Sequence, residues 1–123
     1  DTVGHIGTHP PALAAFKADL ASCSYVLSNA GFELISEALQ LGKRIMVKPL
    51  QGQMEQQSNA LALAQLNLAH STDQLSISAI ASWLNSRHQY HKVQYPNVAS
   101  AICDWLLKGA DENISTLSAA LWR

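Results

Sequence analysis

Short apolar segments alternate with segments of helical period along this chain, and this alternation restricts the fold more than any other feature. Strands are expected at residues 3–7, 25–28, 44–48 and 68–70. Helices are expected at residues 12–22, 32–41, 55–66, 73–84, 98–107 and 114–122. Short apolar strands that alternate with helices of about ten residues are typical of a parallel sheet covered on both faces. The pattern therefore predicts an α/β fold with a Rossmann-like arrangement.

The spacing of apolar residues also predicts which side chains are buried. The first helix carries one stripe at spacings of three or four: Leu13, Phe16, Leu20 and Cys23. The helix at 55–66 is expected to point four residues inward: Ala60, Leu61, Ala64 and Leu66. The three tryptophans are expected to anchor the C-terminal helices to the core: Trp83, Trp105 and Trp122.

Composition excludes several classes of protein. With 48% hydrophobic and 14% charged residues the chain is expected to be globular. Its net charge of −1, without a run of Lys or Arg, argues against nucleic acid as a partner. We expect Cys23 and Cys103 to be reduced core thiols in a cytoplasmic protein, since their spacing suggests neither zinc nor a disulfide framework. No membrane span or signal peptide is expected, and no metal, because His88 and His91 lack a third ligand nearby.

The expected domain organisation is a single nucleotide-binding domain at residues 1–108 followed by a C-terminal helix at 109–123. A doubly wound domain normally opens with its own strand-turn-helix unit, whereas this chain opens with only a short strand. We therefore expect the domain to be truncated at its N-terminus. The last helix is expected to pack toward an N-terminal acceptor domain that the sequence does not include.

Polar residues gather in the turns that follow the second and third expected strands, where open parallel sheets bind ligands. Asn29-Ala30-Gly31 places small residues at a helix N-terminus, which favours a phosphate but is also typical of an ordinary turn. Glu37 lies nearly two turns along that helix, where a carboxylate can accept hydrogen bonds from ribose hydroxyls. Amide and carboxyl side chains in residues 51–59 suit sugar hydroxyls.

These turns carry a resemblance to a known family. The run from Ser28 to Ala38 (SNAGFELISEA), then Gly42-Lys43-Arg44, Pro49 and the run from Glu55 to Ala60 (EQQSNA), resembles the donor-site signature of GT-B glycosyltransferases. The pattern is most similar to the C-terminal, donor-binding domain of the UDP-N-acetylglucosamine transferase that forms lipid II and of related bacterial and archaeal proteins. The resemblance covers about residues 16–66.

The resemblance implies roles for individual residues. Gly31 and the start of the next helix, including Phe32, would face the donor diphosphate, and Glu37 would bind the ribose. Glu55 and Gln56 match the pair that contacts the transferred sugar. Asn59 matches the asparagine that supports this loop.

Two positions depart from the family pattern. Asn29 stands where many relatives have histidine or arginine, so its amide can donate a hydrogen bond but supplies no charge. Glu33 stands where relatives often have a small hydroxyl or amide, and its carboxylate would repel a diphosphate unless it points away. Both departures bear on the strength of donor binding.

The function implied by the resemblance is transfer of a sugar from a nucleoside diphosphate, with a lean to UDP, to an unknown acceptor hydroxyl. Neither a cofactor nor a metal is expected, because a helix N-terminus stabilises the leaving group. The catalytic residues stay unknown, since the base in such enzymes usually comes from the other domain. This chain alone is therefore expected to bind donor without turnover, and peripheral association of the full-length protein with a membrane stays open.

Three alternatives stay open from the sequence. One is a non-catalytic GT-B-like partner subunit, which Asn29 and Glu33 favour. Another is a nucleotide-sugar epimerase, although the arginine and further acidic residues expected around its sugar loop are missing. The last is a nicotinamide-binding domain, which ranks lowest because no G-x-G-x-x-G run follows a strand.

Overall fold

The computed structural model describes residues 2–3 and 6–122. The chain divides into two compact units, Asp1–Val93 and Gln94–Arg123, and each is described by itself. The nucleotide-binding domain expected from the sequence ends at residue 108, beyond the end of the first unit. Assignment of the helix at 98–107 to that domain therefore stays a prediction.

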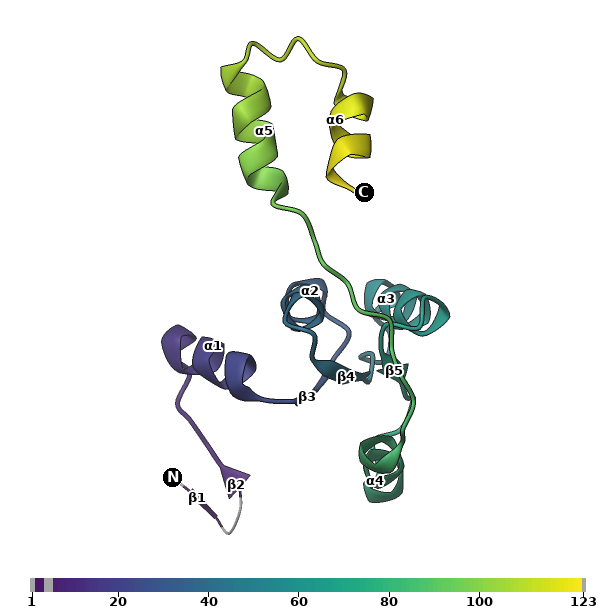
Figure 1. Cartoon of the computed structure of the whole chain (residues 1–123). Coiled ribbons are helices and arrows are strands. Elements are labelled where there is room, and N and C mark those ends of the chain that lie inside the picture. The colour runs from purple at the N-terminus through teal and green to yellow at the C-terminus, as the bar shows by residue number, and fades with distance from the viewer. Residues whose placement is uncertain (1, 4–5, 123) are drawn as a thin grey trace. The chain divides into compact units, whose positions relative to one another are not determined.

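The first unit is built on a three-stranded parallel sheet in the order β3-β4-β5 (Figure 1). Its strands are β3 (Tyr25–Ser28), β4 (Arg44–Val47) and β5 (His70–Ser71). In this register Val26 lies opposite Ile45, and Met46 lies opposite His70. The predicted α/β class and the parallel pairing are confirmed, although the last strand comes slightly later than the expected 68–70.

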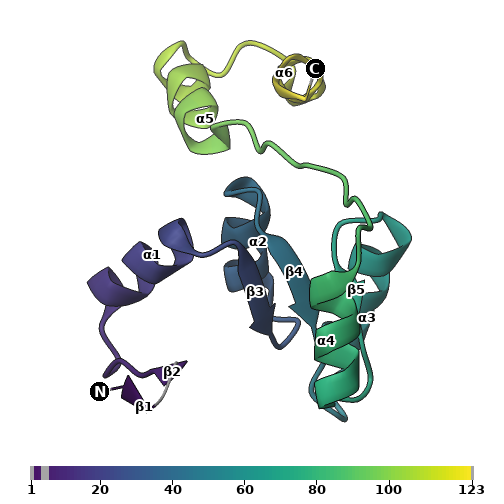
Figure 2. The same ribbon diagram turned by 60° about the horizontal axis from the view of Figure 1, so that its bottom comes forward.

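Helices cover the sheet on both faces. The helices of this unit are α1 (Leu13–Ser22), α2 (Phe32–Gln40), α3 (Met54–Gln65) and α4 (Ile77–Asn85). Helices α2 and α3 lie on one face and α4 lies on the other (Figures 1 and 2). This two-sided cover is the reason that the central strand β4 is almost continuously apolar.

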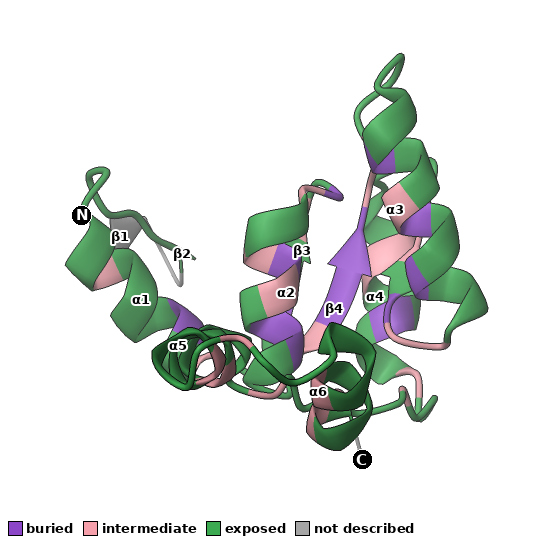
Figure 3. Cartoon of the chain, turned by 90° about the horizontal axis from the view of Figure 1, so that it is seen from above, coloured by how far each residue is buried: buried purple, intermediate pink, exposed green. Residues whose placement is uncertain are grey.

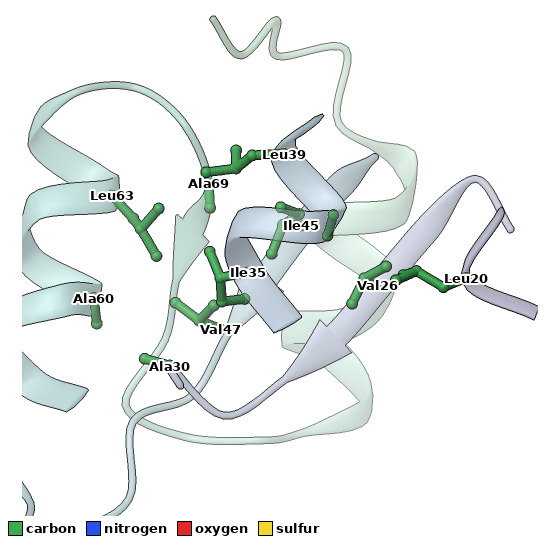
Figure 4. Packing of buried hydrophobic residues seen from close by; sticks show 11 residues of the cluster. Leu20, Val26, Ala30, Ile35, Leu39, Ile45, Val47, Ala60, Leu63 and Ala69 are labelled. Atoms are coloured by element: carbon green, nitrogen blue, oxygen red, sulfur yellow. The ribbon is translucent and has the colours of Figure 1, made fainter. Parts of the chain in front are cut away.

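The core lies around β4, whose Ile45, Met46 and Val47 have no exposed surface (Figure 3). Ile45 and Val47 pack with Ile35 of α2 and Leu63 of α3 in one cluster (Figure 4). Met46 alternates with them along the strand and therefore points to the opposite face. Burial on both faces makes β4 the strand on which the unit depends.

Local signals set the ends of several helices. Gly42, directly after the C-cap of α2, has φ +66°, a left-handed conformation that glycine adopts at helix ends without steric cost. Ser76 begins α4, and its side chain accepts a hydrogen bond from the Ala79 N–H at 3.1 Å. These caps limit the helices to lengths that match the short strands.

The single strand expected at 3–7 is wrong. β1 (Thr2–Val3) and β2 (Ile6–Gly7) pair antiparallel in a separate two-stranded sheet, and residues 4 and 5 lie outside the described residues. An antiparallel pair needs only a short local connection, whereas joining the parallel sheet needs a crossover.

The expected buried stripe of α1 is also wrong. Leu13 is 70% exposed and Phe16 is 46% exposed, Cys23 is partly buried, and Leu20 alone is buried. The parallel sheet ends at β3, and α1 meets it only near its own C-terminus, where Leu20 lies beside Val26 (Figure 4).

Helix α3 buries a different face from the one expected. Ala60 is buried as predicted, but Ala64 is exposed, and Leu61 and Leu66 are about 60% exposed. Gln56 and Leu63 are buried instead, at spacings of four and three from Ala60. The helix is rotated so that a polar side chain, Gln56, points inward, and a search for apolar residues alone cannot find that face.

Cationic side chains gather where helices end. Because the helices run antiparallel to the strands, their C-terminal carbonyls collect at the amino end of the sheet, where the helix dipoles are negative. Lys43 Nζ donates to the carbonyls of Ala21 at 2.6 Å and Cys23 at 2.8 Å. Arg44 Nη2 donates to the Trp83 carbonyl at 3.1 Å. These contacts tie the ends of α1 and α4 to β4.

The second unit is a pair of helices, α5 (Val98–Leu107) and α6 (Ile114–Leu121). Trp105 Nε1 donates to the Glu112 carbonyl at 2.7 Å, which links α5 to the loop before α6.

Trp83 is buried as predicted, but Trp122 is 58% exposed and Cys103 is exposed, so these two expected core positions are wrong. Neither helix buries a residue completely, because two short helices enclose no interior. No helix among the described residues has the length and apolarity needed to cross a bilayer.

Candidate functional site

Two loops lie side by side at the carboxyl end of the sheet. Residues 29–31 join β3 to α2, and residues 48–53 join β4 to α3. The Lys48 N–H donates to the Ser28 carbonyl at 3.0 Å, so the ladder between β3 and β4 continues to the start of both loops. Parallel strands direct such loops to the same edge, which is where ligands bind in open α/β sheets.

Gln56, in the first turn of α3, holds the two loops together. Its side-chain oxygen, Oε1, accepts the Ala30 N–H at 3.3 Å and the Leu50 N–H at 3.0 Å. Gln56 is only 8% exposed, and Ala30 is fully buried. One amide oxygen thus satisfies a backbone donor from each loop, in a place where an unpaired donor would be costly.

Asn59 supports the same turn from one helical turn further along α3. Its Nδ2 donates to the Ala30 carbonyl at 3.0 Å. Both backbone polar groups of Ala30 are therefore satisfied by side chains of α3. The turn after β3 is fixed in place by α3 as well as by its own strand.

The turn at 29–31 is closed further by its own side chains. Asn29 Oδ1 accepts the Gly31 N–H at 3.1 Å, and Ser28 Oγ donates to the Asn29 carbonyl at 2.7 Å. A Cβ added to Gly31 would lie 3.1 Å from Asn29 Oδ1, so a larger residue there would require the Asn29 side chain to shift slightly. Gly31 is the N-cap of α2 and supplies no side-chain hydrogen bond, which leaves the first-turn N–H groups open to a ligand.

The remaining predicted residues are exposed around this clamped turn. Phe32, the first residue of α2, is 71% exposed, and Glu37 is exposed further along the same helix. Glu55 lies in the first turn of α3, next to Gln56. Among the described residues, neither Glu37 nor Glu55 forms an ion pair or a side-chain hydrogen bond. Their carboxylates are therefore available to a ligand.

The structure thus connects four of the predicted residues and leaves three exposed. One hydrogen-bonded assembly around Ala30 contains Asn29, Gly31, Gln56 and Asn59. The sequence predicts Gln56 as a contact to the transferred sugar, whereas in the structure its oxygen accepts backbone N–H groups. The spacing of Gln56, Ala60 and Leu63 on one helical face is the sequence signal that points to this inward orientation.

A parallel sheet covered by helices on both faces defines a Rossmann-like domain. The model of the family described as glycosyl transferase family 1 matches residues 1–87 of this chain, and the chain belongs to that family. Comparison with curated proteins and with solved structures finds no significant match. Membership of the family assigns the chain a role in sugar transfer and implies a nucleotide-sugar donor.

Proposed function

We propose that residues 29–31 and 48–56 form the donor site of a glycosyltransferase and bind a nucleoside diphosphate sugar, with UDP as the preferred nucleotide. The observation that carries this proposal is the clamp made by Gln56 between Ala30 and Leu50. It connects the turn before α2 to the loop before α3 through hydrogen bonds of the protein itself. A preorganised turn binds with a smaller entropic cost than a flexible one.

The first turn of α2 supplies the diphosphate subsite of this proposal. Its N–H groups and the positive end of the helix dipole attract phosphate oxygens and stabilise charge on the leaving diphosphate. Glu37 is assigned to the ribose and Glu55 to the transferred sugar, since both carboxylates are exposed. Gln56 Oε1 already accepts the N–H groups of Ala30 and Leu50, so Gln56 is a positioning residue for both loops.

Titration calorimetry of this chain with UDP, and with ADP, GDP and TDP for comparison, tests the site. We expect saturable binding that prefers UDP. Glu37→Gln should weaken it about ten-fold, the scale of a lost hydrogen bond to a charged group. Glu112→Gln in the second unit is the control and should leave affinity unchanged. Absence of nucleotide binding, or an equal loss in the control, would contradict the proposal.

Glu33 gives a prediction of opposite sign. It lies in the first turn of α2, exposed, where its carboxylate competes with a diphosphate for the same helix dipole. Glu33→Gln is expected to strengthen UDP binding about two- to five-fold, the scale of an exposed charge interaction. The gain should shrink as NaCl is raised, because exposed charges are screened. Unchanged or weaker binding at low salt would show that Glu33 points away from the ligand.

A further inference from the structure

A pocket lies at the amino end of β4, the opposite end of the strand from the proposed donor loops. Its volume is about 190 Å³. Its walls come from the C-terminal end of α2, the start of β4 and residues 88–92. The charged and titratable residues that line it are Lys43, Arg44, His88, Tyr90, His91 and Lys92. Three of the eight Lys and Arg residues of the chain thus line this pocket, and none of its nine Asp and Glu residues does.

These cations lack anionic partners. Within the described part of the chain, Lys43, Arg44 and Lys92 form no ion pair. Lys43 and Arg44 donate to backbone carbonyls, but these neutral acceptors leave the formal charges in place. A helix C-terminus offsets only about half a unit charge. The pocket therefore keeps a positive excess.

Two aromatic rings lie beside the Arg44 guanidinium. The Arg44 guanidinium lies 5.9 Å from the centre of the Tyr25 ring and 5.8 Å from that of Tyr90. Arg44 Nε is buried and has no acceptor among the described residues. Burial raises the pKa of Tyr90, an effect that Arg44 partly opposes. Arg44 and Tyr90 thus place a guanidinium and a phenol hydroxyl among the residues that line the pocket.

We propose that this pocket binds a single phosphate group, either free or as the headgroup of a lipid. Its volume lies below the roughly 300 Å³ at which sites for larger ligands begin, which favours one oxyanion over a nucleotide. The strand β4 has four residues, so its two ends are about 10 Å apart. This site is therefore separate from the proposed donor loops and does not depend on their function.

The test is titration of the chain with sodium phosphate at constant ionic strength, followed by the ¹H–¹⁵N shifts of residues 42–44 and 89–92. Lys92→Gln is the test variant because Lys92 is exposed and its replacement breaks no hydrogen bond or ion pair of its side chain with the described residues. Lys17→Gln, on the exposed face of α1, is the matched control. A second arm measures co-sedimentation with phosphatidylglycerol vesicles, against phosphatidylcholine vesicles.

Saturable shifts at these amides, weakened about three- to ten-fold by Lys92→Gln and unchanged by Lys17→Gln, are the expected result for a free phosphate. Vesicle binding that depends on Lys92 and not on Lys17, without a response to free phosphate, would identify a lipid headgroup. No response in either arm, or an equal loss in both variants, overturns the proposal. The donor proposal is judged separately, from the response of residues 29–37 to UDP.

Discussion

Replacement of Gln56 by alanine is expected to lower the free energy of unfolding of the first unit by about 2–4 kcal/mol and to abolish detectable UDP binding. The substitution removes the oxygen that accepts the Ala30 and Leu50 N–H groups. Ala30 is fully buried, so its N–H has no water to replace the lost acceptor. The turn before α2 and the loop before α3 then lose their common support, and the proposed donor site is no longer held in place.

Urea unfolding followed by circular dichroism measures the first effect and UDP calorimetry the second. Gln57→Ala is the matched control, because Gln57 is the next residue on α3 and is exposed. Its free energy of unfolding should stay within about 0.5 kcal/mol of that of the unmodified chain. Gln56→Glu keeps an acceptor oxygen in place but buries a charge, so its free energy of unfolding is expected to fall between those of Gln56→Ala and Gln57→Ala. If Gln56→Ala is as stable as Gln57→Ala, the clamp contributes nothing.

Replacement of Ile45 by alanine is expected to lower the free energy of unfolding by about 3–5 kcal/mol. Ile45 has no exposed surface, lies on the central strand and packs in the cluster that α2 and α3 form over the sheet. The smaller side chain leaves a cavity that the surrounding helices fill only in part. A loss of this size approaches the whole stability of a small domain.

The same urea experiment separates cavity formation from a general effect of substitution. Ile45→Val removes one methylene and should cost about 0.5–1.5 kcal/mol. Leu61→Ala, on the exposed face of α3, should cost less than about 0.5 kcal/mol even though it also shortens an aliphatic side chain. Equal losses for Ile45→Ala and Leu61→Ala would show that the cluster around β4 is not the core.

The sequence predicts the arrangement of residues 29–31 and 48–56 only in part. Gly31 and Asn29 were assigned from a short turn motif, and the structure shows that turn closed by the Asn29 side chain. The orientation of Gln56 was missed, because an amide in a polar loop is indistinguishable in sequence from a solvent-exposed sugar ligand. Only the neighbouring loop at Leu50 gives that side chain a second partner and a reason to be buried.

The sequence alone determined the order and type of the elements from α1 to α4. Short runs such as residues 44–47 are too apolar and too short for anything but a buried strand, and Gly42 marks the helix end before them. Local propensity and turn chemistry act within a few residues, so a linear pattern records them.

The tertiary structure alone decided which faces of those elements are buried. Leu13 and Phe16 form an apolar stripe that stays exposed, because the sheet ends at β3 and offers α1 only the area beside Val26. Gln56 is buried, because two loops distant in sequence each place a backbone N–H at its oxygen. Burial of a helix face requires a second surface that packs against it, and the spacing of apolar residues in the sequence describes only the face of the helix itself.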